Sequence, residues 1–303
     1  MIIRKKEHWF MMLLIWRGSV LPRLLPRLIL LLLVSLAVVH YHDTLTRWNL
    51  RLNPAPFTLF GIALALFLGF RNNASYERFW EGRKLWGSLL NTTRSLARQA
   101  HTLVDQPNNA TLLINYLITL AYTLKHQLRG TDAAPDIDRL LPPDVAARVK
   151  ATRWKPVFLL KVMGYWVQSG KAANRIDSVS QQSFDQQLSQ LADTIGGCER
   201  IANTPLPYSY NVLLHRTVYI YCFLLPLGLV ESLGWMTPVI VVFIAYTYVA
   251  LEAIADELED PFGLAPNDLA LDTMCRTIEN SLLELDDRPL NPEPDTKDSY
   301  YLT

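Results

Sequence analysis

The acidic run "EAIADELED", from Glu252 to Asp260, is the densest group of potential metal ligands in the sequence. Its carboxylates could hold a cation, but a solvated helix end explains the same pattern more simply. The six histidines are dispersed, and the two nearest in sequence, His40 and His42, point to different faces of a helix. No glycine-rich phosphate loop, GxSxG or HExxH motif is present. The sequence therefore indicates neither an enzyme, nor a cofactor, nor a metal site.

Two rows of side chains between residues 61 and 70 could exclude water and allow helices to pack closely. The bulky apolar row is Ile62, Leu66 and Phe70, and the row of small residues one position away is Gly61, Ala65 and Gly69. Small residues at this spacing let helices approach closely in lipid. The rows are compatible with packing inside one chain. They are equally compatible with several copies of one helix around an axis, where the bulky row would form an apolar constriction that gates by dewetting.

The composition indicates a protein that lies partly in lipid. Half of the 303 residues are hydrophobic, only 19% are charged, and the net charge is +1. A nucleic-acid-binding protein would need a strong basic excess, so this class is excluded. The three cysteines are far apart and odd in number, which favours reduced, structural thiols at Cys198, Cys222 and Cys275.

Four apolar segments are candidates for membrane helices. Each is shorter than the roughly 20 residues of a perpendicular crossing, so helices of a soluble core are the alternative. Flanking arginines and aromatic residues, such as Arg27 before the first segment and Trp235 between the last two, extend them as interfacial anchors. We therefore predict four membrane helices, at residues 28–41, 55–70, 218–230 and 238–255.

Basic residues next to these segments predict the orientation of the chain. They are concentrated before the first helix and after the second, at Arg4, Lys5, Lys6, Arg17, Arg23, Arg27, Arg71, Arg78, Arg83 and Lys84, against Arg47 and Arg51 in the loop between. The positive-inside rule then places both termini and the long middle region in the cytoplasm. The apolar run Trp9–Trp16 is too short for a signal peptide and lacks a cleavage pattern, so we expect an interfacial segment.

One continuous helix is predicted to begin in the second apolar segment and to end far beyond it. Residues 57–70 carry no charge, whereas charged residues are frequent from Arg71 onward, and no proline intervenes. Further helices are predicted at 110–130, ending at Gly130 as a C-cap, and around 183–203. The fold class is an all-α membrane protein. Its predicted segments are an N-terminal cytosolic or interfacial part (1–27), two membrane helices (28–70), a helical cytosolic domain (71–210), two membrane helices (211–255) and a C-terminal cytosolic part and tail (256–303).

Three motifs resemble the bestrophin family of ion channels, specifically its bacterial branch. They are "WRGS" before the first membrane helix, "LGF" at the end of the second with "NNASYERFWEGRKLWG" after it, and "EDPFG" beyond the fourth. They occur in the family's order and span nearly the whole chain. The resemblance implies a homopentamer around a central pore in the bacterial inner membrane, with membrane lipid and permeating monovalent ions as its other partners.

Carried over by position, the resemblance assigns the family's apolar membrane neck to Ile62, Leu66 and Phe70. It assigns a second, cytosolic aperture to the stretch "RIDSVSQQ", with Val179 as the first candidate and Ser180 or Gln182 as alternatives.

Calcium and charge selectivity distinguish the branches of this family. Animal members bind calcium with an acidic cluster after the motif that "EDPFG" resembles, whereas this chain has "LAPND" at 264–268. Since a calcium ion needs about six to eight oxygen ligands, we predict opening that does not depend on calcium. The bacterial branch implies monovalent cations, with chloride and other anions as the alternative.

Two other functions compete with a channel. An alternating-access carrier would show paired repeats and helices broken at the bilayer midplane, but only Pro226 interrupts an apolar segment. A non-conducting membrane scaffold or receptor leaves the two rows at 61–70 unexplained.

Overall fold

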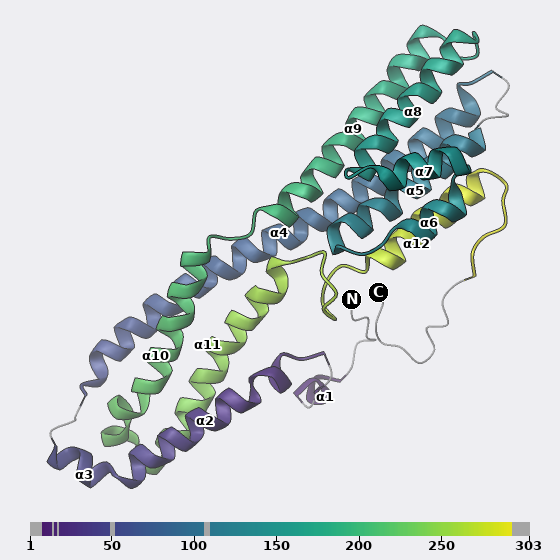
Figure 1. Ribbon diagram of the computed structural model, residues 1–303. Coiled ribbons are helices and arrows are strands. Elements are labelled where there is room, and N and C mark those ends of the chain that lie inside the picture. The colour runs from purple at the N-terminus through teal and green to yellow at the C-terminus, as the bar shows by residue number, and fades with distance from the viewer. Residues whose placement is uncertain (1–7, 14, 17, 49–51, 106–109, 293–303) are drawn as a thin grey trace. The chain divides into compact units, whose positions relative to one another are not determined.

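Helices make up all the regular secondary structure of the residues that the computed structural model describes, which are 8–13, 15–16, 18–48, 52–105 and 110–292. The absence of strands in these residues agrees with the predicted all-α class. The helices are α1 (Trp9–Leu13), α2 (Leu21–His40), α3 (His42–Arg47), α4 (Pro54–Thr102), α5 (Ala110–Arg129), α6 (Ala134–Leu140), α7 (Pro143–Ala151), α8 (Lys155–Ala172), α9 (Ser178–Asn203), α10 (Tyr208–Leu233), the 3-10 turn η1 (Gly234–Met236), α11 (Thr237–Glu259) and α12 (Leu271–Leu285) (Figure 1).

The chain folds into two compact units. Of the described residues, those within 8–79 and 205–260 form one, here called the apolar unit, and those within 80–204 and 261–292 form the other, here called the polar unit. Helix α4 belongs to both, because it runs without a break from Pro54 to Thr102. The predicted continuous helix is therefore confirmed. These units reflect packing, whereas the five predicted segments reflect membrane topology, which remains a prediction.

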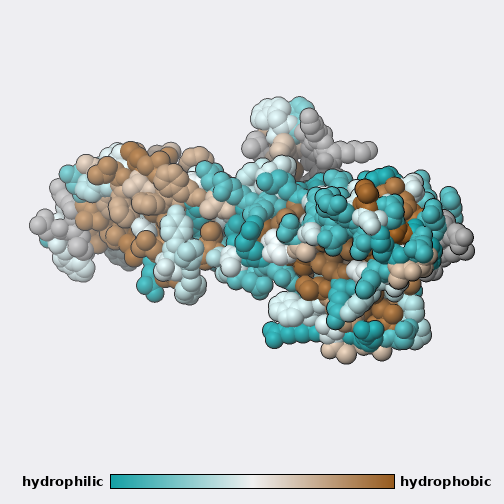
Figure 2. Space-filling model, turned by 90° about the horizontal axis from the view of Figure 1, so that it is seen from above, coloured by the Kyte–Doolittle hydropathy of each residue, from teal (hydrophilic) through white to brown (hydrophobic). Residues whose placement is uncertain are grey.

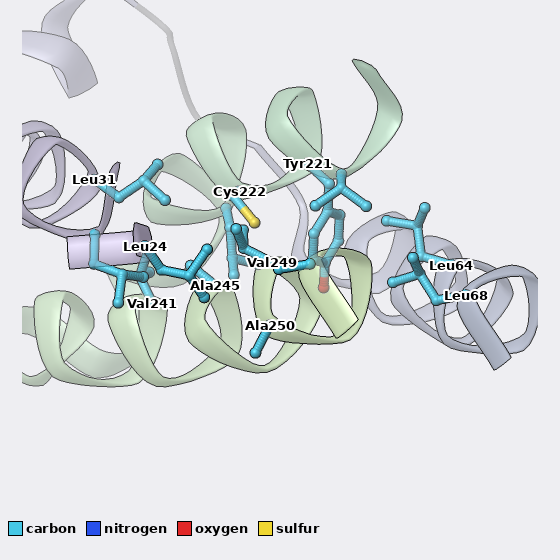
Figure 3. Close-up of a cluster of buried hydrophobic side chains, with 14 residues drawn as sticks. Leu24, Leu31, Leu64, Leu68, Tyr221, Cys222, Val241, Ala245, Val249 and Ala250 are labelled. Carbon is cyan, nitrogen blue, oxygen red and sulfur yellow. The ribbon is translucent and has the colours of Figure 1, made fainter. Parts of the chain in front are cut away.

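The apolar unit is built on α2, α10, α11 and the first part of α4. Leucines of α2 and α4 and small side chains of α11 meet around α10 in one buried cluster (Figure 3). Its labelled members include Leu24 and Leu31 of α2, Leu64 and Leu68 of α4, Tyr221 and Cys222 of α10, and Val241, Ala245 and Val249 of α11. Cys198 and Cys275 of the polar unit are buried and free like Cys222, as the sequence indicated.

Three helical stretches are long and apolar enough to cross a membrane, namely α2, α4 and residues 208–259. The third consists of α10 and α11, which the turn η1 separates at Gly234, where φ is +52°. The helices extend beyond the predicted apolar segments: α2, α10 and α11 contain 20, 26 and 23 residues. Only 28, 22 and 44% of the most apolar window in each stretch is buried in the chain. Large apolar surfaces therefore remain for lipid or for other subunits.

The polar unit is a bundle in which α5 packs against α6, α8, α9 and α12. Helix α9 begins at Ser178, five residues before its predicted start, because the Asp177 carboxylate accepts hydrogen bonds from the amides of Val179 and Ser180. Gly130 follows α5 with φ of +63°, as predicted for a C-cap. Hydrophilic residues dominate the visible surface of this unit, whereas hydrophobic residues dominate that of the apolar unit (Figure 2).

Some predicted features lie outside the described residues. They are the basic residues Arg4, Lys5, Lys6, Arg17 and Arg51 and the tail from residue 293.

Candidate functional site

The first part of α4 has one buried and one exposed face. Leu64 and Leu68 are buried against the other helices of the apolar unit. The bulky row lies on the opposite face of the helix, since its members are offset by two residues, about 200° on a helical wheel. Ile62, Leu66 and Phe70 are 58, 58 and 63% exposed. More than half of the surface of each of these three large apolar side chains is therefore left uncovered by their own unit.

The row of small residues is partly buried and partly exposed. Gly61 is buried: a Cβ atom there would lie 2.7 Å from the hydroxyl of Tyr221, and its carbonyl accepts a hydrogen bond of 2.9 Å from Tyr248. Ala65 and Gly69 are exposed, and a Cβ atom at Gly69 would have no atom within 4 Å. Gly61 thus serves packing inside the chain, whereas the other two leave a shallow surface.

Arg71, which follows the bulky row directly, joins α4 to α11. It is 2% exposed, and its guanidinium donates to Asp256 at 2.5 Å and lies 3.7 Å from the carboxylate of Glu259. The neighbouring Asn72 donates to the carbonyl of Leu251 at 3.1 Å. These contacts fix the rotation of α4 about its axis and so the direction in which the bulky row faces.

The two ends of the "EDPFG" motif act in different units. In the apolar unit, the carboxylate of Glu259 accepts hydrogen bonds from the Leu206 amide at 3.0 Å and from Asn211 at 3.3 Å. In the polar unit, Phe262 is buried, and its ring would lie 3.1 Å from a Cβ atom at Gly82 of α4. Both ends of the motif thus have structural roles.

In the loop that follows this motif, the carboxylate accepts a hydrogen bond from the backbone of the loop itself. Asp268 is buried, and it accepts a hydrogen bond of 2.7 Å from the amide of Ala265. Within the described part of the chain, no group of three or more histidine, cysteine or acidic side chains is arranged to hold a metal ion.

The predicted aperture stretch forms the start of α9. The Val179 side chain is 79% exposed, whereas Ser180 is 8% exposed and its hydroxyl donates to Asp177 at 2.8 Å. The amide and hydroxyl of Ser180 and the amide of Val179 hold the pKa of Asp177 below its usual value. Of the three candidates, Val179 and Gln182 have exposed side chains that can line an opening, whereas Ser180 does not.

Sequence reasoning assigned no special role to Arg71 or Asp177. For Arg71 a signal was present, because it is the first charge after a long uncharged run in a continuous helix. For Asp177 the signal was a capping residue directly before a helix with amphipathic spacing.

Comparison with known proteins identifies a single family. The sequence model described as "Bacterial/Fungal Bestrophin protein" matches residues 1–284. A voltage-dependent anion channel-forming protein of Ralstonia nicotianae is 49% identical over 95% of each chain. The voltage-dependent anion channel-forming protein YneE of Escherichia coli is 38% identical over 99% of each chain.

A solved structure is similar over most of the fold. The crystal structure of a bacterial bestrophin homologue from Klebsiella pneumoniae matches with a TM-score of 0.86 and 40% identity. The match covers 88% of this chain and 99% of the other.

Proposed function

Because this chain belongs to the bacterial bestrophin family of ion channels, we propose that several copies surround one axis and conduct monovalent ions through a pore. Ile62, Leu66 and Phe70 form the neck of this pore in the membrane. The observation that carries the proposal is the exposure of all three side chains on the face of α4 that its own unit leaves uncovered. An apolar ring of this kind gates by losing its water.

The continuity of α4 supports a pore that widens beyond the neck. The helix passes without a break from an uncharged stretch into one with the exposed side chains of Glu77, Arg83 and Lys84. Charged side chains are costly in hydrocarbon and inexpensive in water. We interpret the change of composition as a change of solvent along one continuous helix.

Assembly is proposed to be a homopentamer, the state that the family resemblance implies. Ala65 and Gly69, exposed beside the bulky row, would allow neighbouring α4 helices to approach closely. Native mass spectrometry of the purified protein measures the number of subunits. Replacing Gly69 with leucine should shift the population toward smaller species.

The second constriction is proposed at Val179 in the cytosolic part of the pore. Its side chain is exposed at the first turn of α9, and the cap by Asp177 holds the backbone of that turn. The hydrogen bond from Ser180 to Asp177 turns the serine away from this role.

The topology follows the orientation predicted from the sequence. The four membrane helices are α2, the first part of α4, α10 and α11, with both termini and residues 71–210 in the cytoplasm. Insertion in the bacterial inner membrane is supported by the exposed apolar surface of the apolar unit.

The charge of the permeating ion has two candidates. The curated relatives are named anion channel-forming proteins, which favours anions such as chloride over the cations expected from the resemblance. The uncharged neck cannot select a sign by attraction, so charges elsewhere along the pore must do so. Reversal potentials in a gradient of potassium chloride decide between them, because their sign reports which ion is more permeant.

Recording from purified protein in a planar bilayer tests the proposal as a whole. Discrete current steps at constant voltage are expected of a channel. A scaffold, a receptor or an alternating-access carrier gives none. The continuation of α10 through Pro226 also lacks the broken helix that a carrier would need.

The neck has its own test. Changing Ile62, Leu66 and Phe70 together to alanine should raise the basal current severalfold, because a wider apolar throat wets more readily. Phe67→Ala is the matched control, since Phe67 is also exposed on α4 but lies off the bulky row. Equal currents from the triple variant and the wild type, both correctly assembled, would refute the assignment.

Calcium should have no effect on opening. The loop at 264–268 carries one carboxylate, and Asp268 uses it to hold the loop. Currents recorded in a calcium chelator and in micromolar calcium should therefore be equal. A reversible loss of current in the chelator would contradict this prediction.

A further inference from the structure

Side chains of α5, α6 and α12 in the polar unit line a cavity of about 650 Å³. Its charged lining consists of three carboxylates and three cations, namely Asp136, Asp272, Glu279, Lys125, Arg139 and Arg276. Cavities of 300–1,000 Å³ are typical for small-molecule ligands. The hydrogen bonds of these side chains indicate which ligand the cavity can accept.

The carboxylate of Asp272 is already occupied. One oxygen accepts a hydrogen bond of 2.8 Å from Lys125 and the other accepts one of 2.6 Å from Arg129. Burial raises the pKa of Asp272, but hydrogen bonds and charge from these two cations outweigh it and hold the pKa below its usual value. Asp272 therefore stays ionised and has no oxygen without a donor.

The carboxylate oxygens of Glu279 and Asp136 also each have a polar partner. Glu279 accepts from Arg139 at 2.5 Å and from the Tyr122 hydroxyl at 2.7 Å, through different oxygens. One oxygen of Asp136 accepts from Arg139 at 3.2 Å, and the other lies 3.1 Å from Nε2 of His126. Every carboxylate oxygen that lines the cavity thus has a partner, so the walls offer little to a cationic ligand.

By contrast, some N–H donors of the cationic side chains in the cavity have no acceptor among the described residues. Arg276 lines the cavity, and no ion pair or hydrogen bond joins its guanidinium to any residue that the structure describes. Lys125, which is buried, uses one of its three N–H groups on Asp272. Four cations, with Arg129 included, face three carboxylates, so these side chains carry an excess of one positive charge.

We propose that this cavity binds a small organic anion through its carboxylate or phosphate groups, with Arg276 as the principal anchor. A planar guanidinium with free N–H groups suits either group, because both can accept two parallel hydrogen bonds. The excess of free donors selects an anion, and the volume leaves room for a molecule larger than an inorganic ion. The site lies outside the proposed pore-lining residues, so it does not rest on the proposed function.

Isothermal titration of the purified, full-length assembly tests this site with two probes, citrate for carboxylates and inorganic pyrophosphate for phosphates. At least one should bind with one site per chain, and the better probe identifies the preferred group. Glycerol, which is uncharged, should not bind. Arg276→Gln should weaken binding at least about tenfold, the effect of losing a hydrogen bond to a charged group. Arg276→Lys should weaken it less, because the charge remains.

The matched control is Arg153→Gln, an exposed arginine of the same unit outside the cavity. It should leave binding unchanged, and equal melting temperatures would show that all variants are folded. The proposal is overturned if neither probe binds the wild type, or if Arg276→Gln and Arg153→Gln bind as the wild type does. Because binding is measured without current, a failure here is distinct from a failure of the channel proposal.

Discussion

The apolar and polar units differ in the side chains that cover their surfaces, although each buries some paired charges (Figure 2). In the apolar unit, Arg71 is buried among helices whose outer surfaces are hydrophobic, and its partners Asp256 and Glu259 come from α11. In the polar unit, pairs such as Arg200 with Glu81 lie on the surface, and the apolar side chains are inside. The difference indicates that burial of hydrophobic residues drives folding of the polar unit, whereas the apolar unit also needs an apolar environment around its outer surface.

The largest expected effect comes from breaking the buried ion pair. Arg71→Met should cost about 3 kcal/mol of unfolding free energy, at the low end for a buried ion pair, because Arg71 and Glu259 are largely buried but Asp256 is half-exposed. Denaturant unfolding of the assembly in detergent, followed by tryptophan fluorescence, measures it.

Arg200→Gln is the control for this comparison, since both partners in that pair are well exposed. Its expected effect is within about 0.5 kcal/mol, as for most surface ion pairs. If the two substitutions changed stability equally, the contrast between the units would be wrong.

Substituting glycines in the two halves of α4 tests the same comparison, with a smaller expected effect on stability. Gly61→Ala should destabilise the protein by about 1–3 kcal/mol, because the new methyl group would lie too close to the Tyr221 hydroxyl. Gly87→Ala, in the polar unit, should be neutral or stabilising by up to about 1 kcal/mol, because no atom is within 4 Å and alanine favours the helix. The melting temperature should therefore fall for Gly61→Ala and stay constant or rise for Gly87→Ala, and a fall for Gly87→Ala alone would contradict the packing described.

The smallest effect concerns acid stability of the polar unit. Burial raises the pKa of Glu279, but hydrogen bonds from Arg139 and Tyr122 outweigh it and lower the pKa below its usual value. Its stabilisation is therefore complete above the ordinary carboxyl pKa and is lost as the pH falls through the lower folded-state value. The difference in melting temperature between wild type and Glu279→Gln should shrink between about pH 5 and pH 2. A difference that stayed constant over this range would refute the assignment.

Much of the fold could be predicted because it depends on local patterns. The continuous helix α4 followed from the absence of proline, and the C-cap at Gly130 followed from its place after a periodic apolar run. The helix bounds were less accurate. Helix α2 starts at Leu21 because Pro22 is tolerated in a first helical turn, and the sequence prediction began only with the uninterrupted apolar run at Leu28.

The candidate site could be predicted only in part. Spacing of four residues placed Ile62, Leu66 and Phe70 on one face, but spacing cannot decide whether that face is buried or exposed. It also grouped Gly61 with Gly69, although Gly61 packs against tyrosines of α10 and α11 that lie far away in sequence. The charged cavity has no sequence motif, since α12 brings its residues against those of α5 and α6 from more than 100 residues further along the chain.

By itself, then, the sequence determined the helices, their apolar surfaces and the family, because periodicity and composition are properties of neighbouring residues. Only the tertiary structure decided which face of α4 is left uncovered and that Arg276 has no partner in the described chain. Those outcomes depend on contacts between residues distant in sequence, and the spacing of residues along one helix does not show which other helix packs against them.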